Sequence, residues 1–185
     1  LVRADVELDF KHRRMTLWST DHCHGRVVHW ANRYSSVPFK TDENAGLYFP
    51  MELDGRWGYA NLATGLPTSL LDAEASKTLY GFDEKSAGVE QQSGENGSWT
   101  YFRAMTLATD GLQIRNSRIQ VMPAGTNRCG ISGGDARSTP ARYRKCANDT
   151  PLSLGMNVLS KLHLYIAHKE KMLYFTAADA THDTP

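Results

Sequence analysis

A pattern of residues near the N-terminus returns near the C-terminus at a constant offset of 158 positions, from residue 1 to residue 159. Residues 1–17 and 159–175 align without a gap, and apolar residues match apolar ones while basic residues match basic ones, as in Arg13 with Lys171. Each copy reads as strand, charged turn and strand. The ungapped register favours duplication of a hairpin. The alternative is a chance match of two amphipathic hairpins, because only two of the matched positions are identical.

This repeat predicts how the chain is divided. The second copy closes a lobe, and we expect the first copy to be the last hairpin of a similar lobe that precedes it. The expected parts are the C-terminal hairpin and linker of that sister lobe (residues 1–35), one lobe (residues 36–180) and a tail (residues 181–185). A length of 185 residues suits one domain with a fragment of another.

Between the two copies the chain is mostly strand-like. Short runs of alternating apolar and polar residues are bounded by turns, and Asp54-Gly55 and Asp110-Gly111 each separate two such runs. Asp-Gly is a strong signal for a two-residue hairpin turn, because glycine supplies the positive φ that the turn requires. Pro50 lacks the N–H that a sheet uses, which predicts an edge strand for its run. We therefore expect an all-β fold.

Two short helices are expected among the strands. The first has a capping-box-like start at residues 69–72, good helix formers over residues 73–79, and Gly81 as its stop. The second runs from about Asn157 to Leu162 and is too short to be stable without tertiary packing.

Charge and composition argue against several classes of protein. Lys and Arg number 21 against 20 Asp and Glu, without a long block of one sign, so the chain lacks the basic footprint of a nucleic-acid binder. Hydrophobic residues make up 41% of the chain, which is enough for a core and argues against intrinsic disorder. No apolar run approaches the roughly 18–20 residues of a membrane helix. We expect no nucleic-acid partner and no membrane span.

The cysteines bear on the compartment. Cys129 and Cys146 flank a polar stretch rich in Gly and Arg, and a disulfide closing it would contribute on the order of 3 kcal/mol by restricting the unfolded chain. Such a pair implies an oxidising compartment, so we expect a periplasmic or secreted protein. The alternative is two unpaired thiols in a cytosolic loop. Cys23 is then left over, as the third of three cysteines.

One short segment combines potential metal ligands. It reads Asp21-His22-Cys23-His24, with His29 nearby. Zinc sites use ligands at spacings that let all of them reach one ion. Adjacent residues on an extended chain point to alternate faces, so this segment is a poor match. We expect no metal and no cofactor, and a metal-binding module is a minor alternative.

Residues 59–71 read Tyr-Ala-Asn-Leu-Ala-Thr-Gly-Leu-Pro-Thr-Ser-Leu-Leu and lead from a strand into the first helix. This segment resembles the active-site loop of retropepsin-like aspartic proteases (the pepsin/retropepsin superfamily), in which an apolar strand ends in Asp-Thr-Gly-Ala-Ser. Residues 152–159 resemble the family's second signature, an apolar pair and Gly before a short helix. The order fits over roughly residues 36–178, and residues 21–30 resemble the joint of bacterial two-lobe members. The resemblance implies a closed, barrel-like β domain with one or two short helices.

The resemblance also implies a chemistry, and one residue departs from it. In the family, two carboxylates from two lobes or subunits share a proton and activate a water on a peptide bond. Thr64 and Gly65 match the motif, Ala63 stands at the position of the catalytic Asp, and Leu66-Pro67 replaces the usual Ala-Ser. We expect an aspartic-type endopeptidase family member that is inactive. Ala63 is either an Asp→Ala change made to trap an inactive protease or the mark of a non-catalytic peptide-binding or scaffold protein of the bacterial envelope.

A flap hairpin closes over an extended peptide in such proteases. Trp99 and Tyr101 are the flap candidates, after a Gly-rich stretch at residues 88–98. The alternative is an ordinary core strand, which we prefer for Phe102 and Met105. The implied partners are an extended peptide or protein substrate and a sister lobe or homodimer partner.

Overall fold

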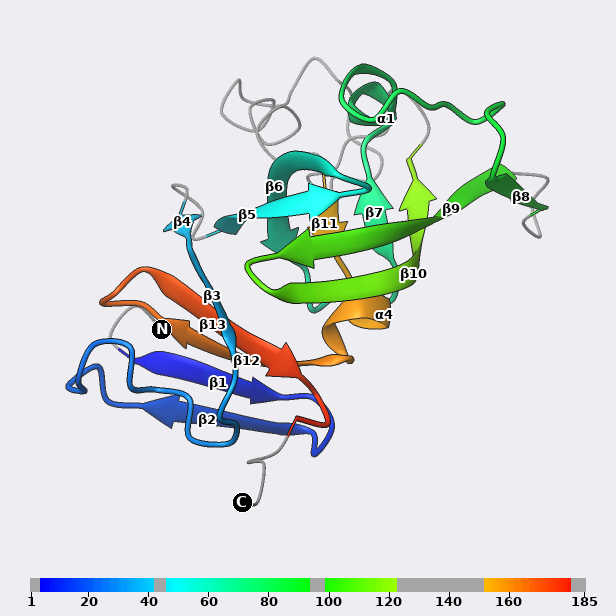
Figure 1. Ribbon diagram of the computed structural model, residues 1–185. Helices are drawn as coiled ribbons and strands as arrows, with labels where there is room; N and C mark the ends of the chain where they lie inside the picture. The colour runs from blue at the N-terminus through cyan, green and yellow to red at the C-terminus, as the bar shows by residue number, and fades with distance from the viewer. Residues whose placement is uncertain (1–3, 42–45, 94–98, 123–151, 181–185) are drawn as a thin grey trace, which may run out of the picture.

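The computed structural model describes residues 4–41, 46–93, 99–122 and 152–180. In these ranges the chain consists of two sheets and two short helices, α1 (Ala73–Thr78) and α4 (Met156–Leu159) (Figure 1). The larger sheet contains, in order, β4 (Lys40–Thr41), β5 (Leu47–Leu53), β6 (Arg56–Leu62), β11 (Leu152–Leu154), β7 (Ser69–Leu71), β10 (Leu112–Val121), β9 (Trp99–Thr109) and β8 (Val89–Ser93). The smaller sheet contains, in order, β2 (Arg14–Trp18), β1 (Asp5–Asp9), β12 (Leu162–Ala167), β13 (Met172–Ala177) and β3 (Ser35–Pro38).

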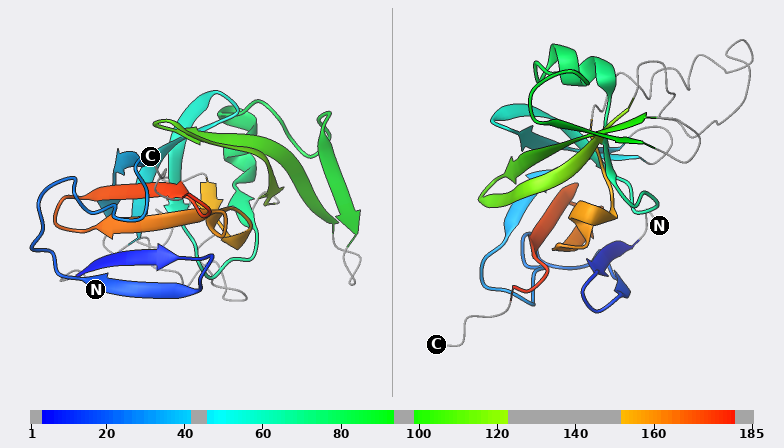
Figure 2. Two further views of the ribbon diagram at one scale, coloured as in Figure 1. Left: turned by 60° about the horizontal axis from the view of Figure 1, so that its bottom comes forward. Right: turned by 90° about the vertical axis from the view of Figure 1, so that its right-hand side faces the viewer.

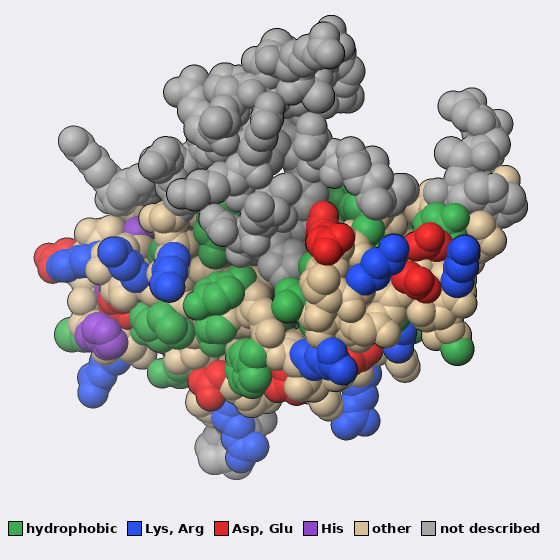
Figure 3. Space-filling view, turned by 90° about the horizontal axis from the view of Figure 1, so that it is seen from above, with side chains coloured by type: hydrophobic (Ala, Val, Ile, Leu, Met, Phe, Trp, Pro, Cys, Tyr) green, Lys and Arg blue, Asp and Glu red, His purple; other side chains and the backbone are tan. Residues whose placement is uncertain are grey.

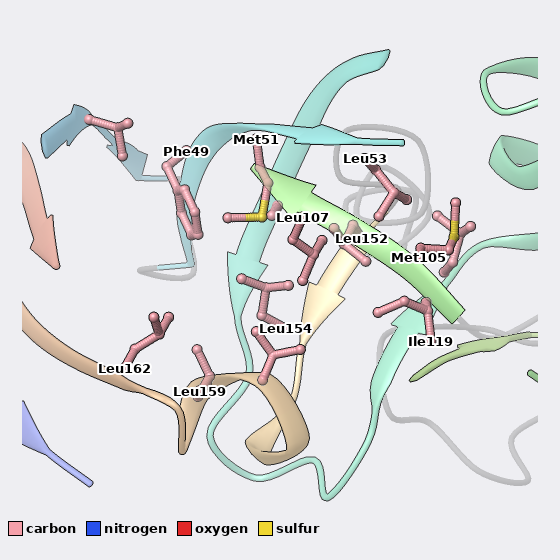
Figure 4. Close-up of a cluster of buried hydrophobic side chains, with 14 of the residues drawn as sticks. Phe49, Met51, Leu53, Met105, Leu107, Ile119, Leu152, Leu154, Leu159 and Leu162 are labelled. Atoms are coloured by element: carbon pink, nitrogen blue, oxygen red, sulfur yellow. The ribbon is translucent and has the colours of Figure 1, made fainter. Parts of the chain in front are cut away.

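The larger sheet closes into a barrel. β5 pairs with β9 as well as with its sheet neighbours, with Leu53 opposite Leu107, so the strands from β5 round to β9 form a ring. The inward side chains fill its interior. They belong to the described core and include Phe49, Met51, Leu53, Met105, Leu107, Ile119, Leu152 and Leu154 (Figure 4). The expectation of an all-β, closed, barrel-like domain with one or two short helices is confirmed for the described residues.

Both Asp-Gly pairs form the hairpin turns that the sequence predicts. Asp54 and Gly55 join β5 to β6 with φ values of 47° and 82°. Gly111, with φ of 84°, lies in the turn between β9 and β10. Asp54 also accepts a hydrogen bond at Oδ1 from the Thr106 N–H (2.7 Å), which ties this turn to β9. The Asp54-Gly55 turn therefore holds three of the barrel strands, β5, β6 and β9, in register.

The helices differ in detail from the expectation. Residues 69–71 form strand β7 rather than a helix start, and Asp72 is the N-cap, with its side chain accepting from the backbone N–H groups of Glu74 and Ala75. The helix ends before Gly81, which has φ of 73°. Helix α4 ends at Leu159, because Leu162 already begins β12. In both cases pairing in a sheet overrides local helix signals.

Pro50 does not lie on an edge strand of the sheet. β5 is flanked by β6 on one side and by β4 and β9 on the other. However, β4 reaches only residues 47–48 of β5, and β9 reaches only residues 52–53. Pro50 thus lies between these two pairings. At this position no strand among the described residues lies where it would accept a backbone hydrogen bond from residue 50. β5 is therefore an interior strand, and it resembles an edge strand only at Pro50, where one side is unpaired.

The smaller sheet lies below the barrel in Figure 1 and is made by the two repeated hairpins plus β3. β1 pairs antiparallel with β12, and Glu7 is opposite Tyr165, its own match in the repeat. Such a register relates the two hairpins by a local two-fold axis at this pair. Their turns agree as well, since Arg13 and Lys171 have φ values of 54° and 55°.

The two faces of this sheet have different character. One face contributes Val6, Leu164 and Phe175 to the core that it shares with the barrel. The right-hand view of Figure 2 shows this sheet below the barrel. The other face carries buried polar groups, among them Glu7 and His163, and is covered by the connection between β2 and β3. No helix among the described residues is long and apolar enough to cross a membrane. Seen from above, basic, acidic and apolar side chains are interspersed over the described surface (Figure 3).

Candidate functional site

The Ala63-Thr64-Gly65 motif forms the turn that follows β6. The Ala63 N–H donates to the carbonyl of Leu154 (2.9 Å), which keeps the end of β6 attached to β11. The Leu66 N–H donates to the carbonyl of Ala63 (3.0 Å), so the chain reverses over Thr64 and Gly65. Ala63 is half-buried and the next two residues are exposed. The motif therefore lies at a tight turn whose tip is open to solvent.

β11 and α4 run beside this turn, although they lie far along the chain. β11 pairs in parallel with β6 and antiparallel with β7, so it fits between the two strands that flank the turn. The Met156 N–H then donates to the carbonyl of Leu66 (2.7 Å), and the Asn157 N–H donates to that of Pro67 (3.0 Å). Figure 4 shows the turn passing beside α4. The structure thus brings together the two motifs that the sequence analysis singled out.

Gly155, between β11 and α4, occupies a position where a side chain does not fit. A Cβ added there would lie 2.5 Å from the carbonyl carbon of Thr68 and 2.8 Å from the backbone nitrogen of Ser69. Both neighbours are backbone, so the turn itself would have to move. Gly65 differs, because a Cβ there meets no atom within 4 Å and its φ is not positive. Packing among the described residues therefore requires glycine at 155 and not at 65.

A hydrogen-bonded clamp joins β7 to α4, and the sequence analysis missed it. The N–H and the hydroxyl of Ser69 both donate to Asn157 Oδ1, each at 2.8 Å. Ser69 Oγ also accepts the Gly155 N–H (2.9 Å), and Asn157 Nδ2 donates to the carbonyl of Arg118 (2.7 Å). The only signal in the sequence was a polar Asn in a short helix that is otherwise apolar. The clamp fixes the base of the turn.

The turn is held firmly, but its own residues offer no acid or base. Ala63 ends in a methyl group, which neither accepts nor donates a proton. The hydroxyl of Thr64 is exposed and makes no hydrogen bond to any other residue that the structure describes. Acid–base chemistry at this turn would therefore need ionisable groups that Ala63, Thr64 and Gly65 do not supply.

The flap candidates lie elsewhere on the barrel. Trp99 begins β9 opposite Ser93 of β8, and Tyr101 is half-buried, with Gln91 Nε2 donating to its hydroxyl at 3.4 Å. The β8–β9 hairpin projects from the right of the barrel in Figure 1, whereas the turn that begins at Ala63 is hydrogen-bonded to α4. No hydrogen bond or ring contact among the described residues joins Tyr101 to the turn. A role for the hairpin over a bound peptide stays a prediction.

Other candidate residues are placed as follows. Phe102 and Met105 are buried, the core position preferred for them from sequence. Cys129 and Cys146 lie outside the described residues, and Cys23 is an exposed free thiol. Among the residues with described positions, no group of three or more His, Cys, Asp or Glu side chains could hold a metal ion. His22 instead pairs with carboxylates of the smaller sheet.

Comparison with known proteins gives similarity at the level of structure only. No family model matches the chain, and no curated protein matches its sequence. A retropepsin-like aspartic protease from Rickettsia conorii is similar in structure, with a TM-score of 0.47 and 15% identity over 80% of this chain and 96% of that one. Basic 7S globulin from soybean gives a TM-score of 0.45 and 8% identity over 96% of this chain and 50% of that one.

Conglutin gamma, a basic 7S globulin from lupine seeds, is also similar, with a TM-score of 0.38 and 8% identity over 77% of this chain and 40% of that one. The chain therefore spans half or less of the two seed globulins. All three TM-scores are below 0.5, so these likenesses assign no activity to this chain.

Proposed function

We propose that this chain carries a lobe of the retropepsin-like aspartic-protease type that lacks its catalytic acid and does not hydrolyse peptide bonds. The observation that carries the proposal is the placement of Ala63. It opens the Thr-Gly turn at the end of a barrel strand, and this turn is bonded to β11 and α4. Both motifs of the resemblance thus meet at one point of the barrel, with a methyl group where the family has a carboxylate.

Loss of this carboxylate is enough to abolish the expected reaction. In an aspartic dyad one carboxylate accepts a proton from the attacking water while the other, protonated, polarises the scissile carbonyl. Removing one member of a catalytic group that acts as a unit costs about four to six orders of magnitude in rate in other hydrolases. Ala63 cannot replace either function. The chain therefore belongs with inactive forms of the protease, whether the alanine is natural or engineered.

A second lobe is part of the proposal, either a sister lobe or a symmetric copy. Met15 and Leu17 on β2 are 63% and 53% exposed, whereas their matches in the repeat, Leu173 and Phe175, are almost fully buried against the barrel. Because the two hairpins are related by a local two-fold axis, a second barrel placed by this axis would cover Met15 and Leu17 in the same way. This exposed pair supports the assignment of residues 1–35 to a sister lobe.

A second candidate function is peptide binding without hydrolysis. β8 is the last strand of the larger sheet, and most of its residues are exposed. An exposed edge can hold an extended peptide by main-chain hydrogen bonds, with alternate side chains giving specificity. A scaffold of this kind in the bacterial envelope would be periplasmic or secreted and is consistent with a Cys129–Cys146 disulfide. Thiol titration before and after reduction tests that pair.

The decisive experiment restores the acid. The full chain, Ala63→Asp and the control Ala63→Asn are incubated with a peptide library between pH 3 and 7, and products are read by mass spectrometry. We expect cleavage only by Ala63→Asp, with inhibition by pepstatin, because Asn matches Asp in shape but cannot ionise. A sister lobe with an intact Asp-Thr-Gly motif is supplied where the chain alone does not pair.

The outcomes separate the two candidates. Cleavage by Ala63→Asp supports the protease ancestry of this turn. Binding of extended peptides by the unaltered chain, with no cleavage by Ala63→Asp at any pH, favours the scaffold function. Hydrolysis by the unaltered chain at the rate of the Asp variant would contradict both.

A further inference from the structure

The connection between β2 and β3, residues 19–34, lies against the polar face of the smaller sheet, and we name it the strap. Val27 is buried there with Tyr165 and Tyr174. Trp30 stacks on His163 with ring centroids 3.9 Å apart. No residue of the strap lies in a helix or strand, although the structure gives a position for all of them. Contacts with the sheet therefore hold this segment in place.

The sheet face under the strap is rich in buried carboxylates. Asp5, Glu7 and Asp9 alternate along β1 and so point to one side of the sheet, and each is at most 3% exposed. A buried charge is costly unless it is paired and hydrogen-bonded. Glu7 accepts from Trp18 Nε1 (2.7 Å) and contacts His163 Nε2 (2.9 Å). These two partners belong to the sheet itself, so Glu7 keeps them without the strap. The strap adds only His29, whose Nε2 is 3.9 Å from Glu7 Oε1 and whose side chain is 52% exposed.

Asp5 depends on the strap for its cationic partner. His22 Nε2 is 2.5 Å from Asp5 Oδ2. The other ring nitrogen of His22 is 3.3 Å from Glu170 Oε1, in the turn between β12 and β13. Glu170 also accepts the Gly25 N–H (3.1 Å) and the Tyr174 hydroxyl (2.6 Å). The imidazole thus bridges two buried carboxylates, one from each of the repeated hairpins.

The other titratable groups around this bridge do not supply a second buried cation. The Tyr165 hydroxyl donates to Asp5 (3.4 Å) and burial raises its pKa far above the usual value, so it stays neutral. The His168 backbone N–H donates to Asp5 (2.8 Å), while burial lowers the pKa of the His168 ring. His24 is 4.0 Å from Glu170 but is 80% exposed.

Tyr174, which faces Glu170 from β13, is neutral for the same reason as Tyr165. Its burial and its bond to Glu170 raise its pKa far above that of free tyrosine. The carbonyl of Cys23 is 3.3 Å from His22 Nδ1 and favours a proton on that nitrogen. Protonated His22, whose side chain is 15% exposed, is therefore the cation that balances the two buried carboxylates.

We propose that the strap is a pH-dependent latch, held on the sheet while His22 is an imidazolium between Asp5 and Glu170 and released when His22 loses its proton. Neutral His22 would leave two carboxylates buried beside each other with no cation between them. Their mutual repulsion and the cost of desolvating them then favour opening of the strap. This inference does not depend on the proposed relation to proteases.

The direction of the pH dependence follows from His22. Burial alone would lower its pKa, but the bond to Asp5, the Cys23 carbonyl and the charges of Asp5 and Glu170 outweigh it and raise the pKa above the ordinary 6.5. A raised pKa gives stability that is complete below pH 6.5 and is lost as the pH rises through the folded-state value. The latch is therefore closed in mild acid and opens towards alkaline pH.

Hydrogen exchange of the full chain tests the latch. Backbone amides of residues 19–34 are labelled at pH 5.5 and 8.5, with labelling times scaled to the intrinsic exchange rate, and read by mass spectrometry. We expect protection of the strap to fall about tenfold or more at the higher pH, because the folded state loses the contribution of the protonated His22. Amides of β12 and β13 should keep their protection. Equal protection of the strap at both pH values would overturn the proposal.

Two variants assign the effect to one side chain. His22→Gln keeps a hydrogen-bonding group but cannot ionise, so the strap should exchange equally fast at both pH values. His24→Gln is the matched control, an exposed histidine on the same segment, and should behave as the unaltered chain does. If His24→Gln alone removes the pH dependence, the latch is assigned to the wrong residue.

Nuclear magnetic resonance of the unaltered chain covers the case in which His22→Gln fails to fold. The His22 ring signal should titrate with a midpoint above 6.5, and the amide signals of the strap should shift with the same midpoint. A midpoint at or below 6.5, or strap signals that do not follow it, would refute the latch.

Discussion

The two hairpins of the smaller sheet have the same backbone and opposite surroundings. β1–β2 and β12–β13 have turns with φ near 54° at matched positions, and they pair with each other around Glu7 and Tyr165. The outer strand of the second hairpin, β13, packs on the barrel and on β3. The outer strand of the first, β2, ends the sheet and exposes Met15 and Leu17.

This difference separates the features that the hairpin sequence itself determines from those that depend on the structure packed against it. Pairing, turn conformation and register are alike in both copies, so they are properties of the repeated sequence itself. Burial of the apolar side chains differs, because it depends on what lies against each copy. The apolar side chains of β2 therefore indicate a contact surface, and the described part of this chain does not contain the partner that would cover it.

The largest expected effect comes from matched truncations at the two outer strands. Phe175→Ala should lower the free energy of unfolding by about 3–5 kcal/mol, because a fully buried ring is removed from a closed core. Leu17→Ala, at the matched exposed position, should change it by no more than about 0.5 kcal/mol. Urea unfolding followed by tryptophan fluorescence measures both. Similar losses for the two variants would mean that Leu17 is covered in solution.

A charged residue on β2 tests whether a second copy of the chain covers the exposed apolar side chains of this strand. If a symmetric copy covers Met15 and Leu17, the chain should self-associate and Leu17→Asp should weaken that association about tenfold or more, or about 1.4 kcal/mol. Sedimentation velocity over a range of concentrations measures this self-association. Trp57→Asp, at an exposed position on β6, is the control and should leave association unchanged. A chain that stays monomeric at every concentration contradicts the symmetric copy.

The smallest effect concerns the turns, where the copies should agree. Arg13 and Lys171 hold a left-handed backbone that costs a non-glycine residue about 1 kcal/mol. Glycine relieves this strain but has more freedom to lose on folding, so Arg13→Gly and Lys171→Gly should each shift stability by less than about 1 kcal/mol. The check is that both shifts have the same sign and size in thermal unfolding. Opposite signs would show that the turns are equivalent in shape only.

The sequence predicted the parts of the fold that depend on neighbouring residues. The Asp54-Gly55 and Asp110-Gly111 turns were found because each pair encodes its own backbone conformation. The start of helix α1 was misplaced, because residues 69–71 gain more from pairing with β10 and β11 than from a helical turn. Closure of the barrel through β5 and β9 joins distant segments, and no local signal reports it.

The candidate site likewise has parts that the sequence predicted and parts that it did not. The Ala63-Thr64-Gly65 turn and the segment around Gly155 were visible as motifs, and the structure places them side by side. The clamp between Ser69 and Asn157 was missed, since its partners are far apart in sequence and each residue alone suits a loop or a helix end. The Asp5–His22–Glu170 bridge was missed as well, because His22 was considered only as a metal ligand.

The position of β1 between β2 and β12 has a practical consequence for anyone who trims this protein. Cutting the chain at residue 36, where the repeat suggests a lobe begins, would strip β12 of its neighbour and leave a bare strand edge lined by apolar residues. Such an edge recruits strands from other molecules. A shortened version should therefore precipitate or pair promiscuously, and expression trials are better served by keeping the first eighteen residues.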